Sequence, residues 1–370
     1  MSAAATTPAG GDRLVAPVLD ALDGARRALL RRLGRSGVVA ALRRRRELRL
    51  TVLTVISIAA AFAAAVLATL PLLLAAPLLF GVPHVVSDVR YLLVRRASRG
   101  TAAVSSAPVL GLLGASTALC VLGAGSLALA AAWAAVLCAG LAAPAGRGAR
   151  VAFAALVLAA AALSLERPAA ATVALAQGHN LVALALGAWV VRGKLRGGFV
   201  PAAVFVAGAA AIALGACDGL LRHAVSPGAS WSTSSGFAAA TFADVRAAVV
   251  PAGLAPVLAL RCVALFAFAQ SVHYGVWLRV VPDAERTSAR PVSFRRSFRL
   301  LEDDLGPRGA RIAVVLSLAL PLAALLSAEG ARRLYVQLSA FHGFIELAFV
   351  ACFVLARSAR RGAVGPERLA

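Results

Sequence analysis

Negative charge is scarce in this chain, which has 16 acidic residues against 38 basic ones and a formal net charge of +22. In a soluble protein such an excess would favour a nucleic-acid partner. Here the arginines lie in short connections between long apolar runs, where they can contact anionic lipid headgroups. We therefore expect no nucleic-acid partner, and we interpret the arginines as signals of membrane topology.

The sequence also lacks several familiar motifs. Its five cysteines stand singly among apolar residues, so we expect buried, inert thiols rather than a disulfide framework or a cysteine metal site. No glycine-rich phosphate loop is present, which argues against an ATPase. The Arg-rich stretch before the first apolar run at Thr51 does not have the short apolar core and cleavage site of a signal peptide.

Apolar residues are abundant. Of 370 residues, 61% are hydrophobic and only 15% are charged, and the mean hydropathy is +0.84. These values lie far outside the range of soluble globular proteins. They predict an all-α fold, a polytopic integral membrane helix bundle, which we expect in the bacterial inner membrane.

A membrane-spanning helix needs roughly 20 apolar residues. By this criterion the chain has about ten transmembrane helices, with a range of eight to ten because several apolar runs are short. The predicted spans are 51–69, 72–94, 104–123, 126–146, 150–165, 169–191, 199–216, 256–281, 311–328 and 334–356.

In a ten-span count the Arg-rich connections all fall on one side, which the positive-inside rule makes the cytoplasmic side, with both termini. We expect a basic N-terminal segment over 1–50, partly disordered and partly a helix on the membrane surface. A transmembrane helical domain over 51–357 and a cytoplasmic tail over 358–370 follow it. The Arg-rich connections are 13–49, 95–99, 147–150, 192–196, 279–311 and 357–368.

Four of the five histidines lie inside predicted spans, and each has a polar neighbour within about one helical turn. An ionisable residue in hydrocarbon is costly and indicates a functional site by default. The fifth histidine, His223, lies in a polar connection. The four histidines within spans are His84, His179, His273 and His342.

Two of these histidines are followed by a carboxylate four residues later. His84 and Asp88 share a helix face, and His342 and Glu346 repeat the spacing in the last span. A carboxylate in this position can orient an imidazole or itself ligate a metal. The alternative is a buried hydrogen-bonded pair that only locks helices together.

The other two histidines have amide neighbours. His179 precedes Asn180, and Gln270 lies three residues before His273, where it can hold the second ring nitrogen. Interhelical hydrogen bonding is the alternative for such mid-span amides. Trp277 suits the interfacial aromatic belt.

Two arginines are candidate charge partners for the carboxylates. Arg90 follows Asp88 closely, and Arg261 lies in a predicted span, where it can pair with Asp88 or Glu346. Snorkelling to the interface is the alternative for Arg261.

Depth along the spans predicts that the four histidines converge. All four lie on even-numbered spans, and at about 1.5 Å per residue they occupy one layer about 10 Å thick near mid-membrane. His273 lies nearest the inner surface. We therefore expect their imidazoles to approach a common centre.

Neutral imidazoles with carboxylate neighbours indicate a site for iron, copper or zinc. We take the four histidines as ligands, and Asp88 and Glu346 as groups that orient them or complete the coordination. Haem held by two axial histidines and a proton-coupled transporter with a histidine and carboxylate relay are the alternatives. Four histidines exceed what one haem requires, which favours a bare metal ion.

The segment Gly81-Val82-Pro83-His84, with Asp88 four residues after the histidine, resembles the Brp/Blh family of membrane β-carotene 15,15'-dioxygenases. Gly81, Pro83, His84 and Asp88 match the family pattern, whereas Val85-Val86-Ser87 replaces a small Gly-Ala pair. The resemblance implies an iron-dependent membrane oxygenase in which histidines hold Fe2+. Its substrate would be a carotenoid or similar hydrophobic molecule entering from the bilayer among the membrane lipids.

An apolar tunnel is expected to accompany such an activity, because a long polyene cannot reach mid-membrane through water. Three glycines beside the histidines would leave room for it, although close helix packing explains them equally well. These glycines are Gly178, Gly275 and Gly343.

Overall fold

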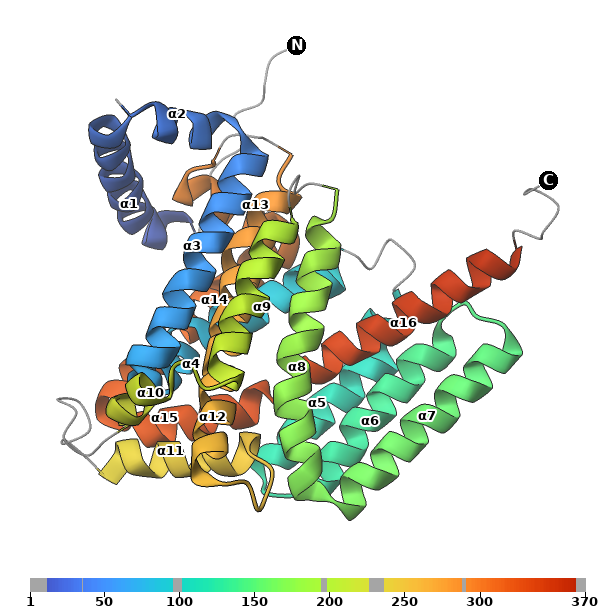
Figure 1. Cartoon of the computed structure of the whole chain (residues 1–370). Coiled ribbons are helices and arrows are strands. Elements are labelled where there is room, and N and C mark those ends of the chain that lie inside the picture. The colour runs from blue at the N-terminus through green and yellow to red at the C-terminus, as the bar shows by residue number, and fades with distance from the viewer. Residues whose placement is uncertain are drawn as a thin grey trace, which may run out of the picture.

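A computed structural model describes the chain over residues 12–34, 36–95, 102–193, 198–225, 236–287 and 291–363. Within these ranges every regular element is a helix and no strand occurs (Figure 1). The all-α bundle predicted from composition is therefore confirmed.

Eight helices in the described part of the chain are long and apolar enough to cross a membrane. The chain is thus an integral membrane protein. These spans are α3 (Arg46–Leu67), α4 with the π-helix η1 (Thr69–Val94), α6 (Gly125–Ala142), α7 (Arg147–Glu166), α8 (Pro168–Val191), α12 with η4 and α13 (Pro256–Glu285), α14 (Phe294–Leu326) and α15 with α16 (Ala328–Ala359).

Two further predicted spans are shorter apolar helices. The span at 104–123 is the 15-residue helix α5 (Ala107–Val121), which follows the 3-10 turn η3 (Ala102–Ser105). The span at 199–216 is α9 (Phe199–Ala213), which meets α10 (Asp218–Val225) at a 73° bend. Gly215 lies in this bend at φ +86°, a left-handed conformation that favours glycine.

The last predicted span, 334–356, is broken. Helix α15 (Ala328–Ser339) ends before Ala340 and Phe341, and α16 begins at His342 and runs to Ala363. The break places His342 at a helix start rather than in mid-helix.

Helices also cover the two ends of the bundle. Helices α1 (Asp12–Leu33) and α2 (Gly37–Arg44) lie at one end, and α10, α11 (Gly236–Val249) and α15 lie across the other (Figure 1). Asp23 connects α1 to α14, because its carboxylate accepts hydrogen bonds from the backbone amides of Phe294 and Arg295 at 2.8 and 3.2 Å. The expected basic N-terminal helix is present, whereas Met1–Gly11 lies outside the described residues.

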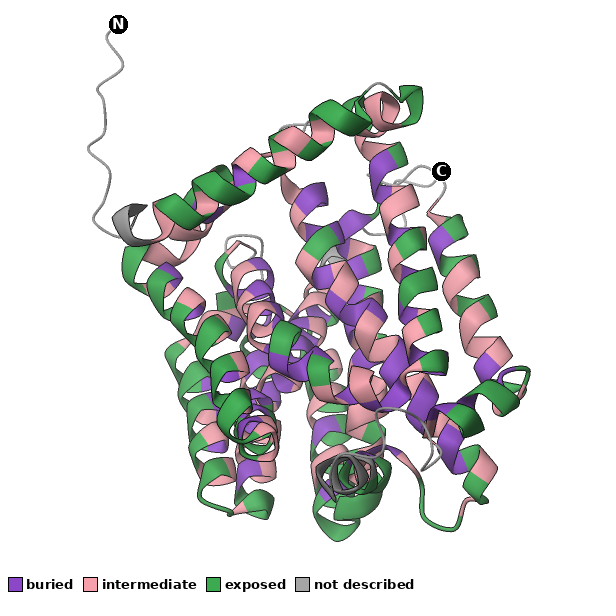
Figure 2. Cartoon of the chain, turned by 90° about the vertical axis from the view of Figure 1, so that its left-hand side faces the viewer, coloured by how far each residue is buried: buried purple, intermediate pink, exposed green. Residues whose placement is uncertain are grey.

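Buried residues gather in the middle of the bundle, while outward faces are exposed (Figure 2). On α14, Leu325 and Leu326 are 81% and 92% exposed, as expected for side chains that face lipid. The prediction that Trp277 lies in an interfacial aromatic belt was wrong. Trp277 lies in the core, is 0% exposed, and donates its indole N–H to the Ala183 carbonyl at 3.2 Å.

Two helices change pitch just after a histidine. The π-helix η1 (Val89–Val94) continues α4 after His84, and η4 (Val276–Val280) continues α12 (Pro256–Gly275) after His273. Single π turns inside helices are frequent at functional sites, because they redirect the side chains that follow.

Candidate metal centre

Four helices bring the histidines together in the middle of the bundle. His84 comes from α4, His179 from α8, His273 from α12, and His342 is the first residue of α16. Neighbouring ring centroids form a closed circuit: 4.3 Å from His84 to His273, 4.8 Å to His179, 4.5 Å to His342 and 5.3 Å back to His84. The convergence predicted from residue depth is confirmed.

Two fully buried carboxylates complete this group, which we call the histidine centre. Asp88 Oδ2 lies 3.1 Å from His84 Nε2, on the same helix. Glu346 Oε2 lies 2.9 Å from His179 Nδ1, and Glu346 Oε1 lies 3.9 Å from His273 Nε2. Glu346 thus faces histidines of two other helices, whereas the sequence spacing had paired it with His342.

Hydrogen bonds determine which ring nitrogen carries the proton in two of the imidazoles. Asn180 donates through Nδ2 to the Ala176 carbonyl, so its Oδ1, 3.0 Å from His273 Nδ1, is the acceptor. His273 therefore carries its proton on Nδ1 and presents the lone pair of Nε2 to the centre. The amide partner expected from the sequence, Gln270, instead donates to the Tyr274 hydroxyl at 3.1 Å.

His342 is oriented in the same way. Its Nδ1 contacts the Ser339 carbonyl oxygen, which can only accept, so the proton is on Nδ1. Its Nε2 lies 3.0 Å from Nε2 of His179. The free end of α15 thus supplies the acceptor, because the carbonyls of a last helical turn have no partner within the helix.

Many polar atoms of the histidine centre have no hydrogen-bond partner in the described part of the chain. They are both ring nitrogens of His84, both carboxylate oxygens of Asp88 and of Glu346, Nδ1 of His179 and Nε2 of His273. The approaches of His84 to Asp88 and of His179 to Glu346 have ion-pair distances without hydrogen-bond geometry. Buried polar atoms are normally paired, so this cluster calls for a further group.

The donors fit a metal ion. One nitrogen from each of His84, His179 and His273 lies within 4.8 Å of the others, and one donor atom from each of His84, Asp88 and His342 does the same. Two ligands on a shared ion with bonds of about 2.0–2.1 Å are at most about 4.2 Å apart, so a small contraction would suffice. His84 belongs to both sets.

An apolar cavity of about 520 Å³ adjoins the centre. His179, His273 and His342 line it together with large side chains such as Trp133 and Phe266. Val336 also lines it and is 50% exposed, so the cavity reaches the surface of the bundle.

The three glycines beside the histidines serve different purposes. Gly178 lines the cavity, and a Cβ there would meet open space. A Cβ on Gly343 would lie 3.3 Å from His179 Nδ1, and one on Gly275 would lie 3.7 Å from Ser57. Gly178 therefore leaves room and Gly343 permits close packing against His179, whereas a Cβ on Gly275 would make an ordinary contact.

Tyr274 was missed in the sequence. It is 4% exposed, and its ring centroid lies 5.2 Å from that of His84. Tyr335 of α15 also lines the cavity, and its ring occupies the space that a Cβ on Gly81 would need. Adjacency to His273 was the one signal for Tyr274.

Both candidate arginine partners are directed elsewhere. Arg261 lies about 18 Å along α12 from His273, too far to reach the histidine centre. It binds Asp218 through two hydrogen bonds of 2.9 and 2.6 Å. Arg90 contacts Asp304 and donates to the Leu300 carbonyl at 2.8 Å. The exposed His223 lies in α10, away from the centre.

No protein-family model, curated protein or solved structure matches the chain. What can be inferred about its function therefore depends on the residues and their geometry.

Proposed function

We propose that the histidine centre holds an iron ion and that the protein is a membrane oxygenase acting on a hydrophobic substrate. One observation carries this proposal: eight buried nitrogen and oxygen atoms of the centre lack a hydrogen-bond partner among the described residues. Imidazole and carboxylate donors suit iron, and a bound Fe2+ would supply the activation of dioxygen.

Each residue has a part in this proposal. His84, His179, His273 and His342 bind the ion through ring nitrogens. Asn180 and the Ser339 carbonyl hold the protons of His273 and His342 on Nδ1 and so keep each Nε2 free. Asp88 and Glu346 balance the positive charge or complete the coordination.

The cavity beside the centre supports a hydrophobic substrate. Its volume of about 520 Å³ is that of a small-molecule site, and its walls are mostly apolar. Val336 and Gly178 line the proposed path from the bilayer. The resemblance of the Gly81 to Asp88 segment to the Brp/Blh family makes a carotenoid the first substrate to test. We further propose that the Arg-rich end faces the cytoplasm, as in a bacterial inner membrane.

Haem and proton-coupled transport remain the competing functions. Ring contacts favour a bare ion over haem, because the His179 and His342 Nε2 atoms are 3.0 Å apart and leave no slot for a porphyrin between them. The buried carboxylates beside imidazoles would also suit a proton relay.

Metal analysis with an optical spectrum separates these functions. Purified wild-type protein should contain about one iron per chain and no Soret band. The His84→Ala variant should lose the iron while it still inserts, and the matched His223→Ala variant should keep it. A Soret band would indicate haem, and a metal-free wild type that binds no added Fe2+ would favour transport.

Activity is tested separately in a host that makes β-carotene. Wild-type protein should bleach the pigment and yield aldehyde products, and the His84→Ala variant should do neither. Unchanged pigment with an iron-loaded protein would exclude β-carotene while leaving the metal site intact.

A further inference from the structure

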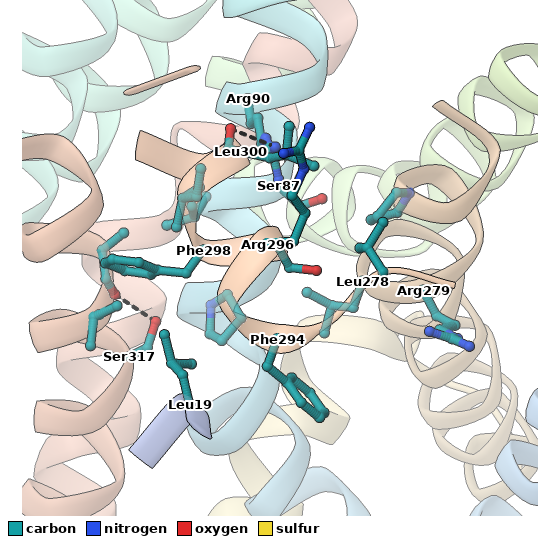
Figure 3. A pocket seen from close by; sticks show the side chains of 18 of the residues that line it. Leu19, Ser87, Arg90, Leu278, Arg279, Phe294, Arg296, Phe298, Leu300 and Ser317 are labelled. Carbon is teal, nitrogen blue, oxygen red and sulfur yellow. Dashed lines mark hydrogen bonds between the residues drawn. The ribbon is translucent and has the colours of Figure 1, made fainter. Parts of the chain in front are cut away.

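A second cavity, of about 850 Å³, lies at the Arg-rich end of the bundle, and we call it the arginine cavity (Figure 3). Its walls come from α1, from α4 with η1, from η4 with α13, and from α14. Pro83 and Ser87 of α4 line it, while His84 and Asp88 of the same helix face the histidine centre. The two sites therefore lie on different faces of α4.

Five arginines but one acidic residue, Glu285, line this cavity, so positive charge exceeds negative charge around it. Arg90 and Arg95 share a single carboxylate, that of Asp304, with a distance of 2.9 Å from Arg95 Nη2. Arg286 lies 3.5 Å from Asp283, which a second arginine binds more closely. Each acidic partner is thus divided between two guanidinium groups.

Two other arginines of the cavity have no such partner. Arg279 of η4 and Arg296 of α14 line it and are exposed, and neither guanidinium forms an ion pair with any described residue. Guanidinium groups bind phosphate oxygens through two parallel hydrogen bonds. The rim of the cavity therefore favours a phosphate-bearing ligand.

The rest of the lining is apolar. Leu278, Phe298 and Val314 line the cavity, and so does Leu318, which is 60% exposed on α14. The apolar part of the cavity thus reaches the lipid-facing side of α14. Leu19 of α1 also lines the cavity (Figure 3).

Both π-helices contribute to this lining. Arg90 and Tyr91 come from η1, and Leu278 and Arg279 come from η4. A π turn widens the helix locally and occurs preferentially at functional sites. The backbone thus departs from regular α-helix at the two segments that border the cavity.

We infer that the arginine cavity binds one anionic phospholipid. Its phosphate would contact Arg279 and Arg296, and one acyl chain would lie along Leu278 and Val314 and leave past Leu318. This site is independent of the histidine centre and does not depend on iron.

Lipid binding to delipidated protein in an uncharged detergent tests the inference. Phosphatidylglycerol should bind the wild type more tightly than phosphatidylcholine with the same chains. The double variant Arg279→Gln, Arg296→Gln should weaken phosphatidylglycerol binding at least about tenfold, because it removes both guanidinium contacts to the lipid phosphate. Arg308→Gln, which removes an exposed arginine of α14 outside the cavity, is the matched control.

Two further arms identify the ligand. Val314→Phe, which fills the apolar part without changing charge, should also weaken binding. Glycerol phosphate, the headgroup without chains, should compete poorly; if it displaced the lipid at equal concentration, the site would be one for soluble anions and the inference would be wrong. Equal phosphatidylglycerol affinity of the double variant and Arg308→Gln, with both unfolding at the wild-type temperature, would also overturn it.

Discussion

The buried carboxylates of the membrane domain differ in the cations that they face. Asp283 is 1% exposed and accepts hydrogen bonds of 2.8 and 3.1 Å from Arg49, whose side chain is 4% exposed. Asp88 and Glu346 are 0% exposed and face imidazoles, with no guanidinium contact in the described part of the chain. A guanidinium is always charged, so Arg49 stays positively charged beside Asp283 and cannot bind a metal ion. A neutral imidazole, by contrast, has a lone pair that is available to a metal.

The difference suggests that the Arg49 pair stabilises the fold, while the histidine centre is held in place by packing around it. Large core side chains support this view, because Trp277 and Phe349 are fully buried in the cluster beside the centre. Stability and metal binding should therefore respond to different substitutions.

The largest loss of stability is expected for Arg49→Ala. This substitution leaves the Asp283 carboxylate buried, and among the described residues its remaining ion pair is the 3.5 Å contact with Arg286. Breaking a buried pair costs about 3–5 kcal/mol. Asp88→Asn should cost less than about 1 kcal/mol in the metal-free protein, because the amide is isosteric with a carboxyl group that has no hydrogen-bond partner among the described residues. Thermal unfolding in detergent measures both losses of stability. Equal losses in the two variants would contradict the view that the two kinds of carboxylate have different roles.

Metal removal should have the next largest effect. At a free Fe2+ concentration about one hundred times the dissociation constant, bound iron stabilises the protein by about 2.7 kcal/mol, which a chelator should remove. The His84→Ala variant should not respond to the chelator. A wild type whose unfolding temperature is the same with iron and with chelator would contradict the proposed metal site.

A smaller effect is expected at Asn180, which orients His273 without belonging to the proposed ligands. Asn180→Ala should lower metal affinity about tenfold to one hundredfold rather than abolish binding. Gln177→Ala is a matched control one helical turn away, because Gln177 donates to the Val249 and Cys262 carbonyls and not to an imidazole. If both variants bound metal equally, Asn180 would have no orienting role.

Much of this organisation was accessible from the sequence. The apolar runs gave the helices, and counting residues from the Arg-rich ends placed the four histidines at one depth, where they meet. His84 with Asp88 was predicted as a pair because both lie within one continuous helix, in which residues four apart share a face.

Partners that depend on tertiary structure were not accessible. His342 and Glu346 have the same spacing, but α16 begins at His342, whose ring contacts the Ser339 carbonyl while Glu346 faces other helices. Arg261 pairs with Asp218 because the bend at Gly215 brings α10 beside α12. Neither the helix break nor the bend has a signal in hydrophobic periodicity.

The attachment of α1 should give the smallest effect, and it depends on pH. Burial raises the pKa of Asp23, but the hydrogen bonds from the Phe294 and Arg295 amides, together with the nearby charges of Arg26 and Arg27, outweigh it and lower the pKa below the ordinary value of 3.8. The charged carboxylate therefore stabilises the attachment at pH values above 3.8, and this contribution is lost as the pH falls through the lowered pKa.

Asp23→Asn should weaken the attachment by about 1 kcal/mol at neutral pH and remove its pH dependence. Hydrogen exchange of α1 amides at neutral pH and at pH values below 3.8 measures both effects. Protection of α1 that changed equally with pH in wild type and variant would assign the dependence to another group.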